Sequence, residues 1–222
     1  MIDEVSHALA EIHADGDTRL LVLRGNGECF SAGMDIGDHL PERVSSMFEK
    51  THQMMKLLSQ MNIPVISLIH GSALGGGLEL AVLADFVYAV AGCKLGVPEI
   101  KLGVFPPLAV AYFAELIGLR NATELILTGR TILPEEAVRL GLINGIFNDQ
   151  DIETRLEEVT TRLLSLSRAA IGSTKKALRL SSLWDRLNEV EKIYLNELMT
   201  TEDAIEGLKA FLEKRKPHWK HR

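Results

Sequence analysis

A hydrophobic stretch at residues 64–70 runs directly into a glycine-rich turn and a second apolar segment, residues 71–81. A short, mostly apolar run of this kind is typical of a strand that is covered on both faces in a parallel sheet. The three consecutive glycines at 75–77 then allow a close backbone approach before a helix begins. The sequence therefore predicts a buried strand, a tight turn and a helix, as in an α/β fold.

Hydrophobic periodicity extends this pattern along the chain and predicts crossover connections between parallel strands. After residue 152 only helical periodicity remains, so the chain divides into a core at 1–158 and a helical C-terminal part at 159–222. The predicted strands are 19–23, 64–70, 85–90 and 142–147, and the predicted helices are 3–14, 42–61, 106–117, 121–128, 134–140, 152–167, 168–181, 184–199 and 201–214.

Composition limits the classes of partner. The 222 residues are 46% hydrophobic, which is enough for a sizeable core. A net charge of −6 argues against nucleic acid or an anionic membrane surface as the main partner, and no apolar stretch reaches spanning length. The seven histidines never form an HxH or HExxH spacing, so no metal site is predicted. Cys29 and Cys93 lie far apart, which favours a reducing, cytoplasmic setting.

Two glutamates stand among apolar neighbours. Glu79 follows the three glycines, and Glu99 lies between Pro98 and Ile100. Partial burial would raise the pKa of both carboxyl groups and suit them to proton transfer near neutral pH. The plainer alternative for Glu99 is an ordinary surface acid on a loop.

Two loops offer backbone amides. The turn at residues 71–79 opens a helix whose first N–H groups are free, which suits an oxyanion or a phosphate. No lysine follows the glycines and the dinucleotide spacing is absent, so an oxyanion hole remains beside the simpler alternative of a packing turn. Residues 31–35 form a second loop of small residues, in which the Met34 amide either points into the same crevice or Met34 merely fills the core.

Three segments together resemble the enoyl-CoA hydratase/isomerase (crotonase) superfamily: Phe-Ser-Ala-Gly-Met-Asp at 30–35, Gly-Gly-Gly-Leu-Glu-Leu-Ala at 75–81, and Pro-Glu-Ile-Lys-Leu-Gly at 98–103. The resemblance covers nearly the whole chain. It implies an α/β fold with a spiral core of repeated strand-strand-helix (ββα) turns and a C-terminal all-helical trimerisation region. It also implies a homotrimer, or a homohexamer made of two trimers.

The resemblance also implies a ligand and roles for residues. The ligand is an acyl-CoA thioester, with coenzyme A as part of the substrate and no separate cofactor. The amides of Met34 and Gly76 take the positions of the oxyanion hole, and Glu79 and Glu99 take those of the two catalytic glutamates. The substrate-binding positions are Ala32, Asp35, Ile36, Gly75, Pro98, Phe105, Pro107, Phe211 and Lys214.

Two departures from the family pattern stand out. Residues 104–109, together with 38–42, resemble the cyclohexadienecarbonyl-CoA hydratases, although the prolines at 106 and 107 are also what a helix start requires. Family members usually begin with a strand pair, whereas the first predicted element here is the helix at 3–14, so one N-terminal hairpin is expected to be missing.

The expected activity is therefore addition of water across the double bond of an α,β-unsaturated acyl-CoA, on a linear chain or a cyclic diene. Two alternatives remain open at this stage. One is double-bond isomerisation with a single glutamate as the proton shuttle. The other is a catalytically silent acyl-CoA-binding homologue.

Overall fold

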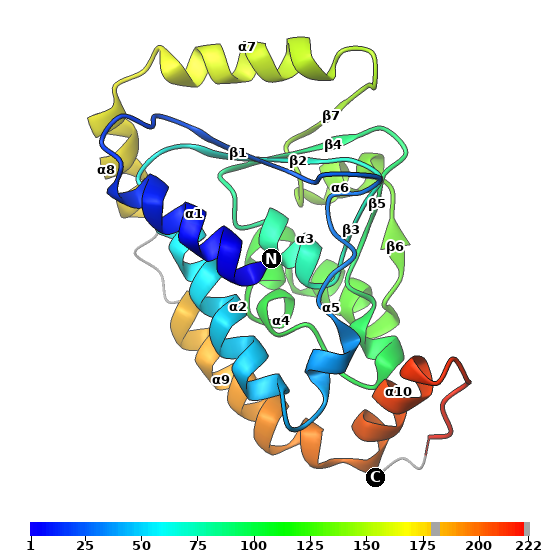
Figure 1. Ribbon diagram of the computed structural model, residues 1–222. Helices are drawn as coiled ribbons and strands as arrows, with labels where there is room; N and C mark the ends of the chain where they lie inside the picture. The colour runs from blue at the N-terminus through cyan, green and yellow to red at the C-terminus, as the bar shows by residue number, and fades with distance from the viewer. Residues whose placement is uncertain (179–182, 220–222) are drawn as a thin grey trace.

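Figure 1 shows the computed structural model of the chain, which describes residues 1–178 and 183–219. Its larger sheet has four parallel strands in the order β1 (Leu21–Arg24), β2 (Val65–Ile69), β4 (Phe86–Val90) and β7 (Gly145–Phe147). All five residues of β2 are buried and four of them are apolar, as expected for a central parallel strand that is covered on both faces. The parallel sheet predicted from the sequence is confirmed.

A second, smaller sheet contains strands that the hydrophobic pattern does not predict. Strand β3 (Ser72–Leu74) pairs in parallel with β5 (Lys94–Gly96), and β5 pairs antiparallel with β6 (Thr131–Ile132). Strands of two or three residues are too short to carry a recognisable alternation, so the hydrophobic pattern gives only a turn here.

The chain alternates between the two sheets as it advances. Strand β2 leads into β3 and then into helix α3 (Gly76–Ala81). Strand β4 leads in the same way into β5, the 3-10 helix η2 (Pro98–Leu102) and helix α4 (Pro107–Ile117). Each turn thus adds a strand to each sheet and ends in a helix. This repeat confirms the α/β, strand-strand-helix (ββα) class of fold.

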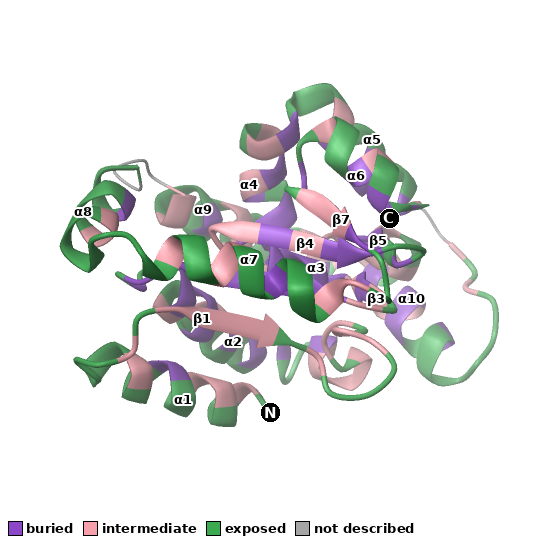
Figure 2. Cartoon of the chain, turned by 90° about the horizontal axis from the view of Figure 1, so that it is seen from above, coloured by how far each residue is buried: buried purple, intermediate pink, exposed green. Residues whose placement is uncertain are grey.

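Helices cover the larger sheet on both sides, with α7 on one side and α2 and α3 on the other (Figure 1). Strand β4 is mostly buried, whereas β1 at the sheet edge is only partly covered (Figure 2). The remaining helices and 3-10 helices are α1 (Ile2–Ala14), η1 (Ile36–His39), α2 (Val44–Ser59), α5 (Leu119–Thr128), α6 (Pro134–Leu140), α7 (Ile152–Leu164), α8 (Arg168–Leu178), α9 (Leu183–Asn196), η3 (Leu198–Thr200) and α10 (Glu202–Leu212).

The C-terminal helices reach back over the core. Helix α9 packs on α4 and α2, and α10 packs on η1 and η2. A separate hydrophobic cluster joins these elements through buried residues of α2, α9 and α10 and the segment after η2, including Phe48, Val104 and Tyr194. The predicted boundary between residues 158 and 159 falls inside α7. The division into two domains remains a prediction.

The predicted helices and strands recur with ends shifted by a few residues, except that residues 179–181 of one predicted helix lie outside the described part of the chain. Within residues 1–178 and 183–219, no helix is long and apolar enough to cross a membrane. The same part of the chain contains no cluster of three His, Cys, Asp or Glu residues that could hold a metal ion.

Candidate functional site

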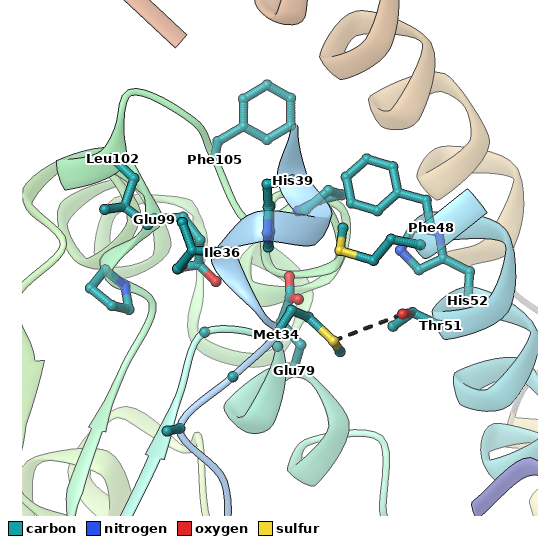
Figure 3. Close-up of a pocket in the computed structure, with 17 residues that line it drawn as sticks. Met34, Ile36, His39, Phe48, Thr51, His52, Glu79, Glu99, Leu102 and Phe105 are labelled. Atoms are coloured by element: carbon teal, nitrogen blue, oxygen red, sulfur yellow. Dashed lines mark hydrogen bonds between the residues drawn. The ribbon is translucent and has the colours of Figure 1, made fainter. Parts of the chain in front are cut away.

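One cavity lies between α2, η1, the start of α3 and η2 (Figure 3). Its volume is about 70 Å³, several times what a single water molecule needs. Ten of the residues named from the sequence line it: Ala32, Met34, Ile36, Gly75, Gly76, Glu79, Pro98, Glu99, Phe105 and Pro107. Seven further residues complete the wall: Gly33, His39, Met47, Phe48, Thr51, His52 and Leu102.

The glycines before Glu79 are required by close packing. Gly75 has a φ of +53°, and a β-carbon at this position would lie 2.4 Å from Oε1 of Glu99. A β-carbon on Gly77 would lie 2.6 Å from Cβ of Ser31. The turn therefore brings the start of α3 against both η2 and the loop at 31–35, which only glycine permits at these distances.

Two segments with free backbone amides meet at this turn. Gly33 has a φ of +102°, and a β-carbon there would lie 3.0 Å from the Leu74 oxygen and 3.7 Å from the Gly76 nitrogen. The loop that carries Met34 thus contacts the first turn of α3. Neither the Met34 nor the Gly76 N–H donates a hydrogen bond to another described residue. Both are therefore free to bind an oxygen atom.

Glu79 is buried, with 5% of its surface exposed, and points into the cavity from α3 (Figure 3). The Ala109 N–H, in the first turn of α4, donates a hydrogen bond of 2.8 Å to Oε1 of Glu79. Burial raises the pKa of Glu79, while the Ala109 and Leu108 amides and the charge of His52 act in the opposite direction. Its surroundings thus contain groups that favour the ionised carboxylate.

Glu99 enters the same cavity from η2 (Figure 3). Burial, and then the neighbouring charge of Glu79, raise its pKa from 4.5 to about 8. Its Oε1 lies against Gly75, and its Oε2 is buried without a hydrogen-bond partner among the described residues. Glu99 is therefore mostly protonated at neutral pH.

Two histidines in the cavity wall escaped the sequence analysis. Nδ1 of His39 donates to the Asp35 carbonyl at 3.0 Å, because a carbonyl can only accept, and burial lowers the pKa of His39. His52 stacks on Phe48 at 5.2 Å between ring centroids, and its Nδ1 pairs with Oε1 of Glu191 on α9. The only sequence signal for His52 was its spacing of four residues from Phe48 on one helix face.

Three of the residues named from the sequence do not line the cavity. The Asp35 carboxylate accepts the Gly37 N–H at 2.7 Å and caps η1. Phe211, at the end of α10, is 53% exposed, and Lys214 follows in a left-handed conformation with a φ of 54°. A contact of Phe211 and Lys214 with coenzyme A therefore remains a prediction, as does a substrate contact of Asp35.

The arrangement joins two free amides with two buried carboxyl groups around a partly apolar cavity. Free N–H groups stabilise negative charge that develops on an oxygen atom. Carboxyl groups with raised pKa values exchange protons near neutral pH. The cavity is suited to reactions that pass through an oxyanion and move protons beside it.

Comparison with known proteins decides the family. A sequence model described as Enoyl-CoA hydratase/isomerase matches residues 1–222. The chain belongs to this family. Cyclohexa-1,5-dienecarbonyl-CoA hydratase of Thauera aromatica is 34% identical to this member of the enoyl-CoA hydratase/isomerase family, over 100% of the chain and 87% of that relative.

Solved structures of two enzymes share the fold. The enoyl-CoA hydratase from Bacillus anthracis is 32% identical, with a TM-score of 0.77 over 100% of this chain and 88% of that one. Methylmalonyl-CoA decarboxylase complexed with 2S-carboxypropyl-CoA is 25% identical, with a TM-score of 0.87 and the same coverage. The enoyl-CoA hydratase/isomerase fold thus extends along the full length of the chain.

Proposed function

We propose that this protein is an enoyl-CoA hydratase, which adds water across the double bond of an α,β-unsaturated acyl-CoA. The observation that carries the proposal is the pair Glu79 and Glu99 in one cavity with the free amides of Met34 and Gly76. Isomerisation is not favoured, because both glutamates are present and the first relatives are named hydratases. No cofactor other than the coenzyme A of the substrate takes part in the proposed reaction.

The proposed chemistry starts at the thioester carbonyl. When water attacks the β-carbon, negative charge moves onto the carbonyl oxygen, and the Met34 and Gly76 N–H groups stabilise it. One such donor typically contributes about 3 to 4 kcal/mol to the transition state.

Proton transfer is divided between the two glutamates. Glu79, whose amide and histidine neighbours favour its charged form, takes a proton from the attacking water. The hydroxyl group bonds to the β-carbon, and protonated Glu99 gives its proton to the α-carbon. The added atoms together are one water molecule, and a proton returned from Glu79 to Glu99 restores the enzyme.

The acyl group proposed for this chain is a cyclic diene or a short enoyl chain. The similarity to the Thauera aromatica enzyme supports the cyclic substrate. The cavity also has flat and apolar walls at Phe48, Leu102 and Phe105, against which a ring can pack. The coenzyme A moiety would extend outside the cavity, towards Phe211 and Lys214.

The test uses purified protein with crotonyl-CoA and with cyclohexa-1,5-dienecarbonyl-CoA, followed by loss of the enoyl thioester absorbance. Glu79→Gln and Glu99→Gln are each expected to lower kcat/KM by about 10² to 10⁴-fold, the usual contribution of a general acid or base. Glu49→Gln, on the exposed face of α2, is the matched control and should leave the rate unchanged. A folded wild-type protein that hydrates neither substrate would refute the proposed function.

We also propose a cytoplasmic location. Cys29 and Cys93 are both free thiols in the structure, which is the usual state in a reducing compartment. Alkylation of the denatured protein, extracted without reductant, should modify both thiols. Finding either one oxidised in the cell would contradict this location.

A further inference from the structure

Two buried polar atoms near the cavity lack a hydrogen-bond partner. Among the described residues, such side-chain atoms are Oε2 of Glu99, the hydroxyl of Tyr194, and Oγ of Ser67 in β2. Buried polar groups are almost always satisfied, because an unmade hydrogen bond costs the full desolvation of the group. Two unsatisfied atoms in one region therefore indicate a partner that is shared between them.

Tyr194 lies directly behind the cavity wall. It is on α9, has 0% of its surface exposed, and contacts the rings of Phe48 and Phe105 edge-on, with centroid distances of 4.7 and 5.1 Å. Both phenylalanines line the cavity that contains Glu99 (Figure 3). Tyr194 also packs in one cluster with Val104, whose N–H donates to the Glu99 carbonyl at 3.3 Å.

We propose that Tyr194 is the positioning residue of Glu99, and that one water molecule joins its hydroxyl to Oε2 of Glu99. The proposal rests on the proposed function, since it gives Glu99 a proton to hold and release. Oε1 of Glu99 already lies against Gly75, so a bond at Oε2 would fix the orientation of the whole carboxyl group.

A hydroxyl group is the appropriate partner for a carboxyl group that changes its protonation state in every turnover. A phenol both donates and accepts, so it can donate to the ionised carboxylate and accept from the protonated acid. Burial, followed by the charges of Glu99 and Glu79, raises the pKa of Tyr194, which keeps the phenol neutral in both states. An arginine or a backbone N–H would instead hold Glu99 in its ionised form.

The test is Tyr194→Phe, which removes only the hydroxyl and keeps the ring between Phe48 and Phe105. We expect kcat for enoyl-CoA hydration to fall at least about tenfold with little change in KM, because orientation of Glu99 matters only in the transition state. The Glu99 pKa should rise, because the hydrogen bond made to the charged carboxylate is stronger than the one made to the neutral acid, and both are lost. The pH-rate profile should shift accordingly.

Tyr88→Phe is the matched control. Tyr88 lies on β4, away from the cavity, and stacks on Phe147 at 4.6 Å. Its substitution should change neither kcat nor the pH profile. Melting temperatures of both variants show whether they remain folded.

The Glu99 pKa can be measured without turnover, from the infrared carboxyl band that is absent in Glu99→Gln. If the wild-type protein hydrates no substrate, the proposed function fails. A higher Glu99 pKa in Tyr194→Phe, measured from this band, would still support the bond. An unchanged titration in a folded Tyr194→Phe protein overturns the proposal, whether or not the wild type is active. Unchanged kcat and pH profile in an active enzyme overturn it equally.

Discussion

Glu79 and Glu99 face one cavity, but their immediate partners differ. Glu79 accepts the Ala109 N–H and is influenced by His52, whereas Oε2 of Glu99 accepts nothing from the described residues. Burial raises the pKa of both carboxyl groups, but the Ala109 amide and the charge of His52 oppose this rise at Glu79, whereas the charge of Glu79 adds to it at Glu99. Groups whose surroundings push their pKa values apart can serve as base and acid in one step. The proposed division of roles therefore rests on contacts rather than on residue type.

The raised pKa of Glu99 predicts a pH-dependent stability. An acid with a raised pKa holds its proton more tightly in the folded than in the unfolded chain, so its contribution to the unfolding free energy falls as pH rises from about 4.5 to about 8. A pKa that differs by one between the folded and the unfolded chain corresponds to about 1.4 kcal/mol. Glu99→Gln should remove this loss, so the variant is expected to be more stable than the wild type at about pH 8.

Urea unfolding at about pH 5 and about pH 8 measures this effect. The difference between Glu99→Gln and wild type should be larger at the higher pH. Glu49→Gln, at an exposed position, should follow the wild type at both values. A difference between Glu99→Gln and wild type that does not change with pH would show that Glu99 titrates normally in the folded protein.

At the residue scale, the sequence identifies the two glutamates but misses the two histidines. Glu79 and Glu99 lie in short segments whose glycines, prolines and apolar neighbours are local signals. The partner of His52 is Glu191, which lies 139 residues further along the chain. Nothing in the local pattern of α2 distinguishes such a histidine from a surface residue, because the pairing depends on how α2 and α9 pack.

At the scale of elements, the start of α3 combines a backbone conformation that needs glycine with a contact to Glu99. The helix has only six residues, and it begins at the cavity. Its entry through Gly75 needs a positive φ and places Oε1 of Glu99 where a side chain would otherwise stand. The turn thus orients α3 and leaves room for the second glutamate.

Gly75→Ala should distinguish the effect of this turn on the orientation of α3 from its effect on Glu99. A backbone with a φ of 53° and a ψ of −130° costs an alanine about 1 to 3 kcal/mol, and its methyl group would also displace the Glu99 carboxyl group. Gly92→Ala is the control, because Gly92 has a φ of +80° and nothing within 4 Å of an added β-carbon. Both variants should lose unfolding free energy, but only Gly75→Ala should lose hydration activity by more than about tenfold.

Urea unfolding and hydration rates of the two variants give the comparison. Equal activity in Gly75→Ala and Gly92→Ala would mean that Glu99 tolerates displacement. In that event, contact between the turn and Glu99 is irrelevant to the reaction.

The sequence predicts the long helices but not the short strands. Long periodic helices such as α2 and α9 could be predicted, because each buries a continuous apolar face. The strands of the small sheet could not, because β3, β5 and β6 are stabilised by pairing between segments distant in sequence. The sequence likewise does not predict that α9 packs beside the cavity and supplies Glu191 and Tyr194.

At the scale of the whole molecule, an apolar groove lies between the ends of α7 and α8, beside the start of β4. Leu163, Leu166, Ile171 and Leu178 line it together with Phe86. Leu166 is 50% exposed and Leu178 is 77% exposed. Exposed apolar surface that is gathered in one place is typical of a contact between proteins. Because the family resemblance implies a homotrimer or a homohexamer, we propose a second copy of this chain as the occupant.

Sedimentation equilibrium should therefore give a mass three or six times the 24.5 kDa of one chain. Replacing Leu166 and Leu178 by aspartate should shift the protein to smaller species, because buried, unpaired carboxylates strongly destabilise an apolar contact. Ala10→Asp, at an exposed position on α1, introduces the same charge away from the groove and should leave the mass unchanged. A wild-type mass of one chain would refute the oligomer, whereas an unchanged assembly in the double variant would place its interface on another surface.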